Sequence, residues 1–173
     1  MRKIIIVCGT PGSGKTTYAR KIAAAGAMTL LDIDTATERL VKVGLVESGH
    51  RPDDRDSDYF KRTYREPVYQ ALFDIARDNL PFNDVVITGP FTREIREPDW
   101  PGRLSRELGS PVEVHYVQCP PAIRRQRLAA RGDARDRAKL ENWVRYIEYY
   151  GEEHPPVFEH VLVDGASASG NAV

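Results

Sequence analysis

The sequence predicts an α/β fold in which a parallel sheet is covered by helices on both faces. Short runs of β-branched and apolar residues alternate with segments whose apolar residues recur every three or four positions. The runs are almost continuously apolar, which is typical of strands that are buried on both faces. Right-handed crossovers between such strands bring their carboxyl ends to one edge of the sheet, where functional groups gather.

Five segments carry the strand pattern, and the interval between the second and third is the longest. The strand segments are residues 3–8, 28–33, 84–88, 112–118 and 159–163. Within the long interval, residues 34–83, apolar residues at helical spacing predict a helix around Pro67. Because proline removes a helical hydrogen bond, we expect a kink or a new helix start near Glu66, with Pro67 in the first turn. The charged segment before it, residues 47–58, is expected to be an exposed loop.

The length and charge of the chain limit its number of domains and the partners that it would attract. With 173 residues, of which 41% are hydrophobic, the chain is long enough for one domain, expected over residues 1–164, followed by a disordered tail over residues 165–173. Lys plus Arg and Asp plus Glu both number 25, so no overall basic field would attract nucleic acid. No run approaches the roughly 18 apolar residues of a membrane span. We expect a cytoplasmic protein, a monomer or a dimer, in which Cys8 and Cys119 are buried thiols.

The first strand segment leads into a glycine-rich loop. Gly9, Gly14, Lys15 and Thr16 fit the pattern G-x-x-x-x-G-K-[ST] between a strand and a helix. Glycines let backbone N–H groups turn inward around phosphate oxygens, and the helix that follows adds its positive N-terminal end. Lys15 would reach the β- and γ-phosphates, and Thr16 would present a hydroxyl to Mg²⁺. The predicted nucleotide-binding residues here are Gly9, Thr10, Pro11, Gly12, Ser13, Gly14, Lys15, Thr16 and Thr17.

Two carboxylates follow the second strand segment, which ends in "LLDID". Period-two geometry predicts that Asp32 and Asp34 lie on the same side of that strand, at the edge where the glycine-rich loop begins. One carboxylate near a nucleotide positions Mg²⁺ through water, a role that we assign to Asp32. The other, Asp34, would accept the proton of an attacking hydroxyl. Alternatively Asp34 is the N-cap of a helix that begins near Thr35, and the two roles are compatible.

The third strand segment ends in Thr88, at a place where many phosphate-loop proteins carry an aspartate for the metal. A hydroxyl cannot supply that charge, so metal binding would rely on Thr16, Asp32 and the phosphates themselves. The next five residues either wall the pocket of a phosphate acceptor or form an ordinary loop between a strand and a helix. They are Gly89, Pro90, Phe91, Thr92 and Arg93.

Six arginines follow the fourth strand segment: Arg124, Arg125, Arg127, Arg131, Arg135 and Arg137. Arg127 and Arg131 are four residues apart and therefore share one helical face. Because the planar guanidinium matches phosphate oxygens, we predict a mobile lid at about residues 124–139, in which these two arginines bind ATP and assist catalysis. Asp133 and Asp136 interrupt the cluster, so a solvated helix surface with internal ion pairs remains the alternative.

These motifs resemble those of the small P-loop kinases, specifically the AAA-like ATP-binding group that includes polynucleotide 5′-kinases and zeta-toxin-type kinases. The resemblance is carried by "GTPGSGKT", by Asp34 and by "RLAARG", which is similar to the paired lid arginines of polynucleotide kinases; "LLDID" also looks like the shikimate kinase pattern. Relatives often have an arginine three residues after the aspartate, where this chain has Thr37, which counts against a nucleic-acid end as acceptor. The resemblance implies a five-stranded parallel sheet ordered 2-3-1-4-5, with ATP and Mg²⁺ at its carboxyl edge.

The expected activity is therefore transfer of the γ-phosphate of MgATP to a hydroxyl of a small-molecule acceptor. Lys15, Arg127 and Arg131 would stabilise the transferred charge, and Asp34 would activate the hydroxyl. Two alternatives remain open. One is a polynucleotide 5′-hydroxyl kinase, and the other is an ATP-hydrolysing switch or binding module, which the absence of a metal-binding aspartate at Thr88 keeps possible.

Overall fold

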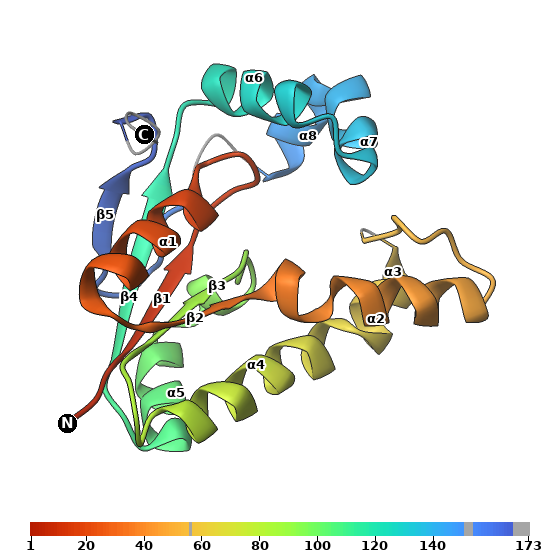
Figure 1. Cartoon of the computed structure of the whole chain (residues 1–173). Coiled ribbons are helices and arrows are strands. Elements are labelled where there is room, and N and C mark those ends of the chain that lie inside the picture. The colour runs from red at the N-terminus through yellow and green to blue at the C-terminus, as the bar shows by residue number, and fades with distance from the viewer. Residues whose placement is uncertain (56, 151–153, 168–173) are drawn as a thin grey trace.

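The computed structural model describes residues 1–55, 57–150 and 154–167, and in this part of the chain five strands form one parallel sheet. The strands are β1 (Ile4–Cys8), β2 (Thr29–Asp32), β3 (Val85–Thr88), β4 (Val112–Gln118) and β5 (Val161–Asp164). Their order is β2-β3-β1-β4-β5 (Figure 1), so the predicted fold class and strand order are confirmed. In this register Asp32 lies beside Thr88 at the carboxyl edge.

Helices cover both faces of the sheet. They are α1 (Lys15–Gly26), α2 (Ile33–Glu47), α3 (Asp58–Thr63), α4 (Arg65–Asn79), α5 (Trp100–Leu108), α6 (Pro121–Arg131), α7 (Arg137–Glu141) and α8 (Trp143–Tyr150), with short 3-10 turns at Glu94–Arg96 and Ala134–Asp136. Alternate residues of β1 divide between the faces: Ile5 and Val7 pack with α1, whereas Ile4 and Ile6 pack with α4 and α5. Every residue of β1 is buried, as its continuous apolar run predicts.

The two cysteines are free and buried, as predicted. Cys8 ends β1, and Cys119 directly follows β4. No helix in the described residues is both long enough and apolar enough to cross a membrane.

The segment between β2 and β3 forms an arm that extends from the carboxyl edge of the sheet (Figure 1). Helix α3 ends at Thr63 and α4 begins at Arg65, so Pro67 lies in the first turn of a new helix, as predicted. Helices α2 and α4 pack through Val41, Leu45 and Val68, with the rings of Tyr59, Phe60 and Tyr64 against this cluster. The arm thereby brings α3 to a cavity that Gly12 and Lys15 of the glycine-rich loop also line.

The end of the chain is described as far as residue 167. Ala166 donates its backbone N–H to Asp164 Oδ1 at 2.9 Å, which closes a tight turn after β5. Residues 168–173, most of the tail that we predict to be disordered, lie outside the described residues.

Candidate functional site

The glycine-rich loop after β1 approaches its neighbours so closely that a side chain would clash at Gly9 and would be tightly confined at Gly12. At Gly9, where φ is 142°, a Cβ atom would lie 2.4 Å from the carbonyl oxygen of Val117. At Gly12, where φ is 79°, it would lie 3.0 Å from the carbonyl oxygen of Arg124. Both positions thus need glycine for conformation and for space. The loop is fixed between the end of β4 and α6, directly before α1.

Polar groups of this loop are arranged as an anion would need them. The N-cap of α1 is Gly14, which has no side chain to cap the helix, and the first turn contains no acidic residue. The hydroxyl oxygens of Thr10 and Ser13 are buried and have no hydrogen-bond partner in the described part of the chain. Buried polar atoms of this kind are uncommon and call for an explanation. Together with the open helix N-terminus, they fit the phosphate oxygens of a nucleotide.

Lys15 is the first residue of α1, and its side chain turns back over the loop. Its Nζ donates a hydrogen bond to the carbonyl oxygen of Thr10 at 2.9 Å. Burial lowers the pKa of Lys15 from 10.5 to about 8, although the neighbouring carboxylates of Asp34 and Asp32 oppose this shift. A charged amine that is costly to bury is stabilised when an anionic ligand binds beside it.

The two carboxylates after β2 differ in position. The prediction that they share one side of a strand is wrong, because β2 ends at Asp32 and Asp34 already lies in the first turn of α2. The predicted alternative for Asp34 is wrong too, since the N-cap of α2 is Asp32, whose Oδ1 accepts the N–H of Thr35 at 2.9 Å. Both carboxylates nevertheless line the same cavity.

Thr16 and Asp32 are the residues that fit a magnesium ion. Thr16 donates its hydroxyl to Asp32 Oδ2 at 3.1 Å, so two oxygen ligands lie side by side at the start of α1. In the described residues no group of three or more His, Cys, Asp or Glu side chains is able to hold a metal. Mg²⁺ keeps several waters and is held by one or two carboxylates together with substrate phosphates, so this small oxygen set suits an ion that arrives with a nucleotide.

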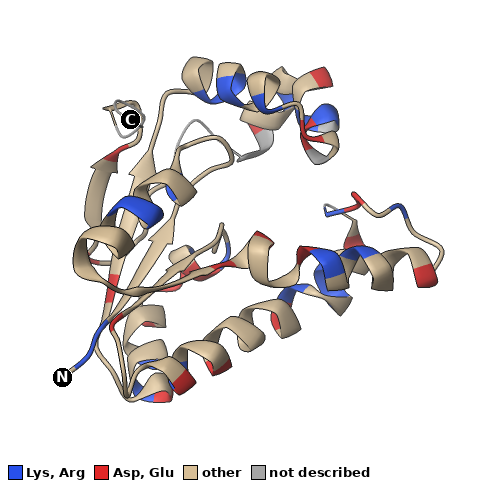
Figure 2. Cartoon of the chain, in the orientation of Figure 1, with Lys and Arg blue, Asp and Glu red and all other residues tan. Residues whose placement is uncertain are grey.

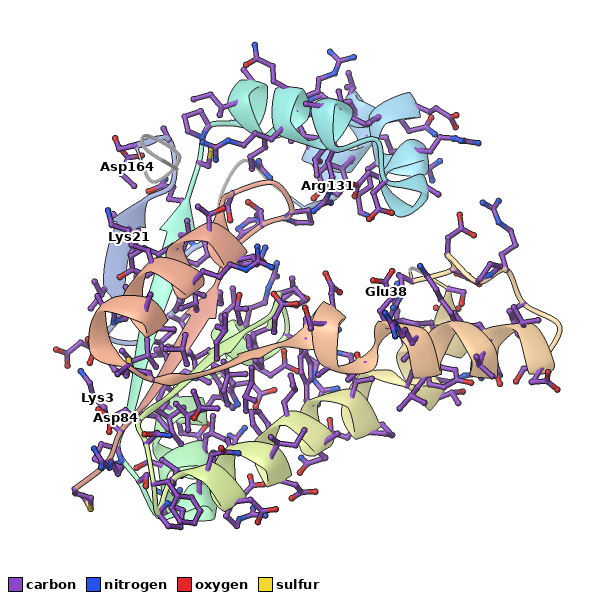
Figure 3. All side chains as sticks on the ribbon, viewed as in Figure 1. Lys3, Lys21, Glu38, Asp84, Arg131 and Asp164 are labelled. Atoms are coloured by element: carbon purple, nitrogen blue, oxygen red, sulfur yellow. The ribbon has the colours of Figure 1, made fainter. Side chains whose placement is uncertain are left out.

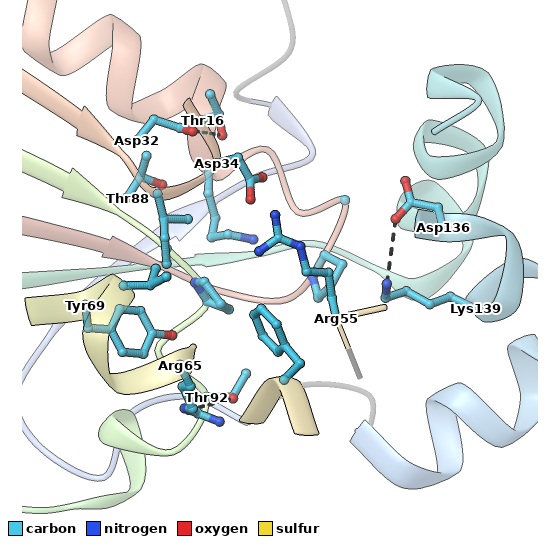
Figure 4. A pocket seen from close by; sticks show the side chains of 18 of the residues that line it. Thr16, Asp32, Asp34, Arg55, Arg65, Tyr69, Thr88, Thr92, Asp136 and Lys139 are labelled. Atoms are coloured by element: carbon cyan, nitrogen blue, oxygen red, sulfur yellow. Dashed lines mark hydrogen bonds and ion pairs between the residues drawn. The ribbon is translucent and has the colours of Figure 1, made fainter. Parts of the chain in front are cut away.

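Two cavities meet at the glycine-rich loop. The large cavity, about 280 Å³, extends from the loop toward the α2–α4 arm and contains Asp32, Asp34 and Thr88 in its wall (Figure 4). The small cavity, about 180 Å³, lies on the other side, between the loop and α6. Both are lined by Gly12, Lys15, Thr16 and Arg131. A group bound at Lys15 is therefore accessible from both cavities.

The two predicted lid arginines make different contacts. Arg127 lines the small cavity and donates to the carbonyl oxygens of Ser13 at 3.2 Å and Gly165 at 2.9 Å. Arg131, at the end of α6 (Figure 3), lines both cavities and forms an ion pair with Asp136, with its Nε 2.9 Å from Oδ2. Of the remaining cluster, Arg124 is fully buried, Arg125 and Arg137 are exposed, and the side chain of Arg135 lies outside the described residues.

The loop after β3 only partly forms the wall that one of our two interpretations assigned to it. Gly89, Pro90 and Thr92 line the large cavity together with Thr88. Phe91 lies in the core instead, where its ring stacks on Tyr69 with the centroids 4.7 Å apart. Arg93 forms an ion pair with Glu97 at 3.6 Å and is largely exposed.

Sequence reasoning missed the side of the large cavity that the arm supplies. Arg55, Phe60, Lys61, Arg65 and Tyr69 line it there, and Lys139 and Tyr146 line it from the α7–α8 side. Figure 2 shows that Lys and Arg residues occur both on α6–α8 and on the arm. The available signal was the interleaving of basic and aromatic residues in "RDSDYFKRTYRE", which we interpreted as an exposed loop followed by a core helix.

Comparison with known proteins gives two kinds of relative, an adenylate kinase and UPF0200 proteins. Adenylate kinase isoenzyme 1 of Homo sapiens is 28% identical over 162 residues, which cover 90% of this chain and 78% of that protein. A UPF0200 protein of Saccharolobus solfataricus is 27% identical over 146 residues, covering 83% of this chain and 72% of the relative.

Solved structures resemble this chain in fold. A sugar kinase from a Janibacter species has a TM-score of 0.60 at 17% identity, covering 96% of this chain and 86% of its own. A shikimate kinase from Bacteroides thetaiotaomicron has a TM-score of 0.53 at 16% identity, covering 98% and 89%. At these identities the likeness is one of fold alone.

The family model described as "AAA domain" matches residues 4–152, a range that includes the glycine-rich loop, both carboxylates after β2 and the predicted lid. The chain therefore belongs to this AAA domain family (AAA_33), a family of ATP-binding P-loop kinases.

Proposed function

We propose that this protein transfers the γ-phosphate of MgATP to a hydroxyl of a small-molecule acceptor. The observation that carries the proposal is the meeting of the two cavities at Lys15, Thr16 and Arg131. A nucleotide in the small cavity would direct its terminal phosphate toward this junction, and an acceptor would approach it from the large cavity. Asp34 lines only the large cavity, on the acceptor's side.

The chain's own residues have distinct roles in nucleotide binding. The loop residues Gly9–Gly14 and the N-terminus of α1 bind the phosphates, with Arg127 beside the loop in the wall of the small cavity. Thr16 and Asp32 would hold Mg²⁺, which neutralises part of the phosphate charge when it is bound. Lys15 and Arg131 place positive charge at the junction, where negative charge develops during transfer.

The transfer itself needs a base. The carboxylate of Asp34 accepts the proton of the acceptor hydroxyl as the acceptor oxygen forms a bond to the γ-phosphorus. The bond between that phosphorus and the oxygen that bridges to the β-phosphate breaks, and ADP leaves with this oxygen and its electron pair. Lys15 and Arg131 stabilise the charge on the moving phosphoryl group.

A phosphate acceptor is the second candidate, because the name of the relative adenylate kinase describes a kinase of a nucleotide. Asp34 favours the hydroxyl: an ionised phosphate has no proton to lose and gains nothing from a carboxylate beside it. The names of the sugar kinase and the shikimate kinase agree with a small hydroxyl compound as acceptor, and their likeness to this chain is one of fold. The formal net charge of zero counts against a polynucleotide.

The test is to supply ATP labelled in its γ-phosphate together with one of three acceptor pools: a metabolite extract, the nucleoside monophosphates, or oligonucleotides with a free 5′-hydroxyl. We expect label on a compound of the extract with the native protein and none with Lys15→Ala. Label on a nucleoside monophosphate or on an oligonucleotide would replace the proposed acceptor. Label on inorganic phosphate alone in all three pools would indicate an ATP-hydrolysing switch.

A further inference from the structure

The arm side of the large cavity carries three basic residues, Arg55, Lys61 and Arg65, which we call the basic wall. They come from the loop before α3, from α3 and from the start of α4, and they line the large cavity but not the small one. We propose that the basic wall binds an anionic group of the acceptor, a carboxylate or a phosphate. This inference rests on the proposed function and narrows it: the acceptor is a small hydroxyl compound that carries a negative charge of its own.

Charge balance in the cavity is the first argument. Six Lys or Arg residues and three Asp residues line it. Of the six cations, Lys15 and Arg131 lie at the junction with the small cavity. A third, Lys139, forms an ion pair with Asp136, which also pairs with Arg131. Asp32 lies at the glycine-rich loop, hydrogen-bonded to Thr16. On the arm side, the ion pair with Glu94, which does not line the cavity, balances Arg65, whereas Lys61 forms no ion pair with a described residue. The basic wall thus adds cationic side chains to the arm side of the cavity.

Arg65 is held in a fixed orientation. Its Nη2 donates to Glu94 Oε2 at 3.1 Å and to Thr92 Oγ1 at 3.4 Å, and its guanidinium lies over the ring of Tyr69, 5.9 Å from the centroid. Its Nε is buried and lacks a hydrogen-bond partner in the described part of the chain. A guanidinium that is held from one side keeps this N–H as an unused donor, and a carboxylate or phosphate oxygen is a suitable acceptor for it.

The neighbours of Arg65 extend the same surface. Lys61 forms no ion pair with any residue that the structure describes, and it lines the cavity. Arg55 lies over the ring of Phe60, 5.2 Å from the centroid, and Figure 4 shows its side chain reaching into the cavity. The rings of Phe60 and Tyr69 add apolar surface for a carbon skeleton. An acceptor with its anionic group at Arg65 would have its body along these rings and its hydroxyl toward Asp34.

The test measures binding, so that it does not depend on transfer. The phosphate-binding loop is first saturated with Mg²⁺ and a non-hydrolysable ATP analogue, and calorimetry then follows two matched series of probes. One series is glycerol, glycerate and glycerol 3-phosphate; the other is ribose, ribonate and ribose 5-phosphate. We expect an acidic or phosphorylated member to bind at least 10-fold more tightly than its neutral parent. The comparison of the acid with the phosphate identifies which anion the basic wall prefers.

Three variants locate the binding. Arg65→Gln should weaken binding of the anionic probe about 10- to 100-fold, the usual effect of losing a charged hydrogen-bonding group. Lys61→Gln breaks no described ion pair, so it keeps the test valid if Arg65→Gln fails to fold; it should weaken binding about 3- to 10-fold. The matched control is Arg62→Gln, an exposed arginine on α3 that does not line the cavity, and it should bind as the native protein does.

The inference is overturned by any of three results. These are absence of binding by every anionic probe, equal binding of the neutral parents, and unchanged binding in both Arg65→Gln and Lys61→Gln. Its failure is distinguishable from failure of the proposed function. If anionic probes bind through Arg65 but the native protein transfers label to no hydroxyl, the basic wall stands and the transferase is refuted. If label is transferred to a neutral alcohol without any anion preference, the transferase stands and the basic wall is refuted.

Discussion

The two carboxylates after β2 should fail in different ways when they are substituted. Asp32→Ala removes the cap of α2, worth about 1 kcal/mol, and the hydrogen bond from Thr16, worth about 1 kcal/mol. The expected loss in the free energy of unfolding is therefore about 2 kcal/mol. At about 2–4 °C per kcal/mol for a chain of this size, Asp32→Ala should lower the Tm of the nucleotide-free protein by about 4–8 °C.

Asparagine at the same two positions separates stability from chemistry. Asn is as good an N-cap as Asp, so Asp32→Asn should retain most of the stability, and its lost charge should raise the Mg²⁺ concentration that transfer requires. Asp34→Asn keeps the shape of a side chain that does not cap the helix, and so should change the Tm by less than about 2 °C. Without the base, transfer should fall about 10²- to 10⁴-fold, and added Mg²⁺ should not restore it.

The assay combines thermal melting without nucleotide and initial rates across a range of Mg²⁺ concentrations. Native protein, Asp32→Ala, Asp32→Asn and Asp34→Asn are compared in parallel. The loss of about 4–8 °C in Tm is expected from the cap and one hydrogen bond in Asp32→Ala. If Asp34→Asn shows this loss and Asp32→Ala does not, the assignment of the cap is refuted. Rescue of Asp34→Asn but not of Asp32→Asn by Mg²⁺ would reverse the roles of base and metal ligand.

Three further predictions concern the cations at the junction of the two cavities. Lys15→Ala should abolish transfer and the stabilisation by MgATP without lowering the Tm of the nucleotide-free protein at pH 7. Burial lowers the pKa of Lys15 to about 8, so the charged amine is costly in the folded state. Melting curves with and without MgATP check this prediction, and near-native turnover would contradict it. That cost is fully present below pH 8 and fades as the pH rises toward 10.5, where the amine is neutral in the unfolded chain as well. The nucleotide-free protein therefore carries a neutral Lys15 at pH 9, so at this pH MgATP should bind with proton uptake and more weakly than at pH 7. Calorimetry in two buffers of different ionisation enthalpy measures the proton uptake. Binding without proton uptake at pH 9 would contradict the prediction. Arg131→Ala should lower turnover about 10³-fold or more, whereas Arg125→Ala on the exposed face of α6 should not; similar rates in both would mean that Arg131 serves only as a partner of Asp136.

The sheet and the phosphate-binding loop were predictable because their signals are local. A continuous apolar run such as residues 4–8 needs burial on both faces, and alternation with helical segments then requires parallel pairing. The glycines before Lys15 mark a backbone conformation that few other residues adopt, as φ at Gly9 and Gly12 shows. The new helix start at Pro67 is local for the same reason, since proline acts on its own turn.

The error at Asp32 and Asp34 came from one assumption about where the strand ends. Period-two spacing holds only while the chain is extended, and here the side chain of Asp32 itself begins α2 by capping Thr35. A capping residue one position inside the expected strand rotates the next carboxylate away from the predicted side. The motif was therefore placed at the correct edge of the sheet, while the geometry of its second carboxylate was not predictable from spacing.

The basic wall was not predictable, because its position depends on packing between segments that are distant in the sequence. Tyr64 approaches α2 so closely that a Cβ atom at Gly44 would lie 2.3 Å from the tyrosine hydroxyl oxygen. This contact and the cluster around Val41 and Leu45 fix the arm and thereby direct Arg65 toward the cavity. Charge and periodicity in the sequence describe each segment alone and contain no information on which cavity a given arginine lines.

Transfer of a phosphoryl group to a hydroxyl leaves a direct signature in the ³¹P NMR spectrum of the reaction mixture. The protein is incubated with MgATP and the acceptor that receives label, and the spectrum is recorded without proton decoupling. We expect a new phosphate monoester signal, split by the hydrogens on the carbon that bears the esterified oxygen. This signal should grow in step with ADP and should be absent with Lys15→Ala. ADP formed without any new monoester, a phosphoanhydride signal beyond that of ADP, or inorganic phosphate as the only product would contradict this expectation.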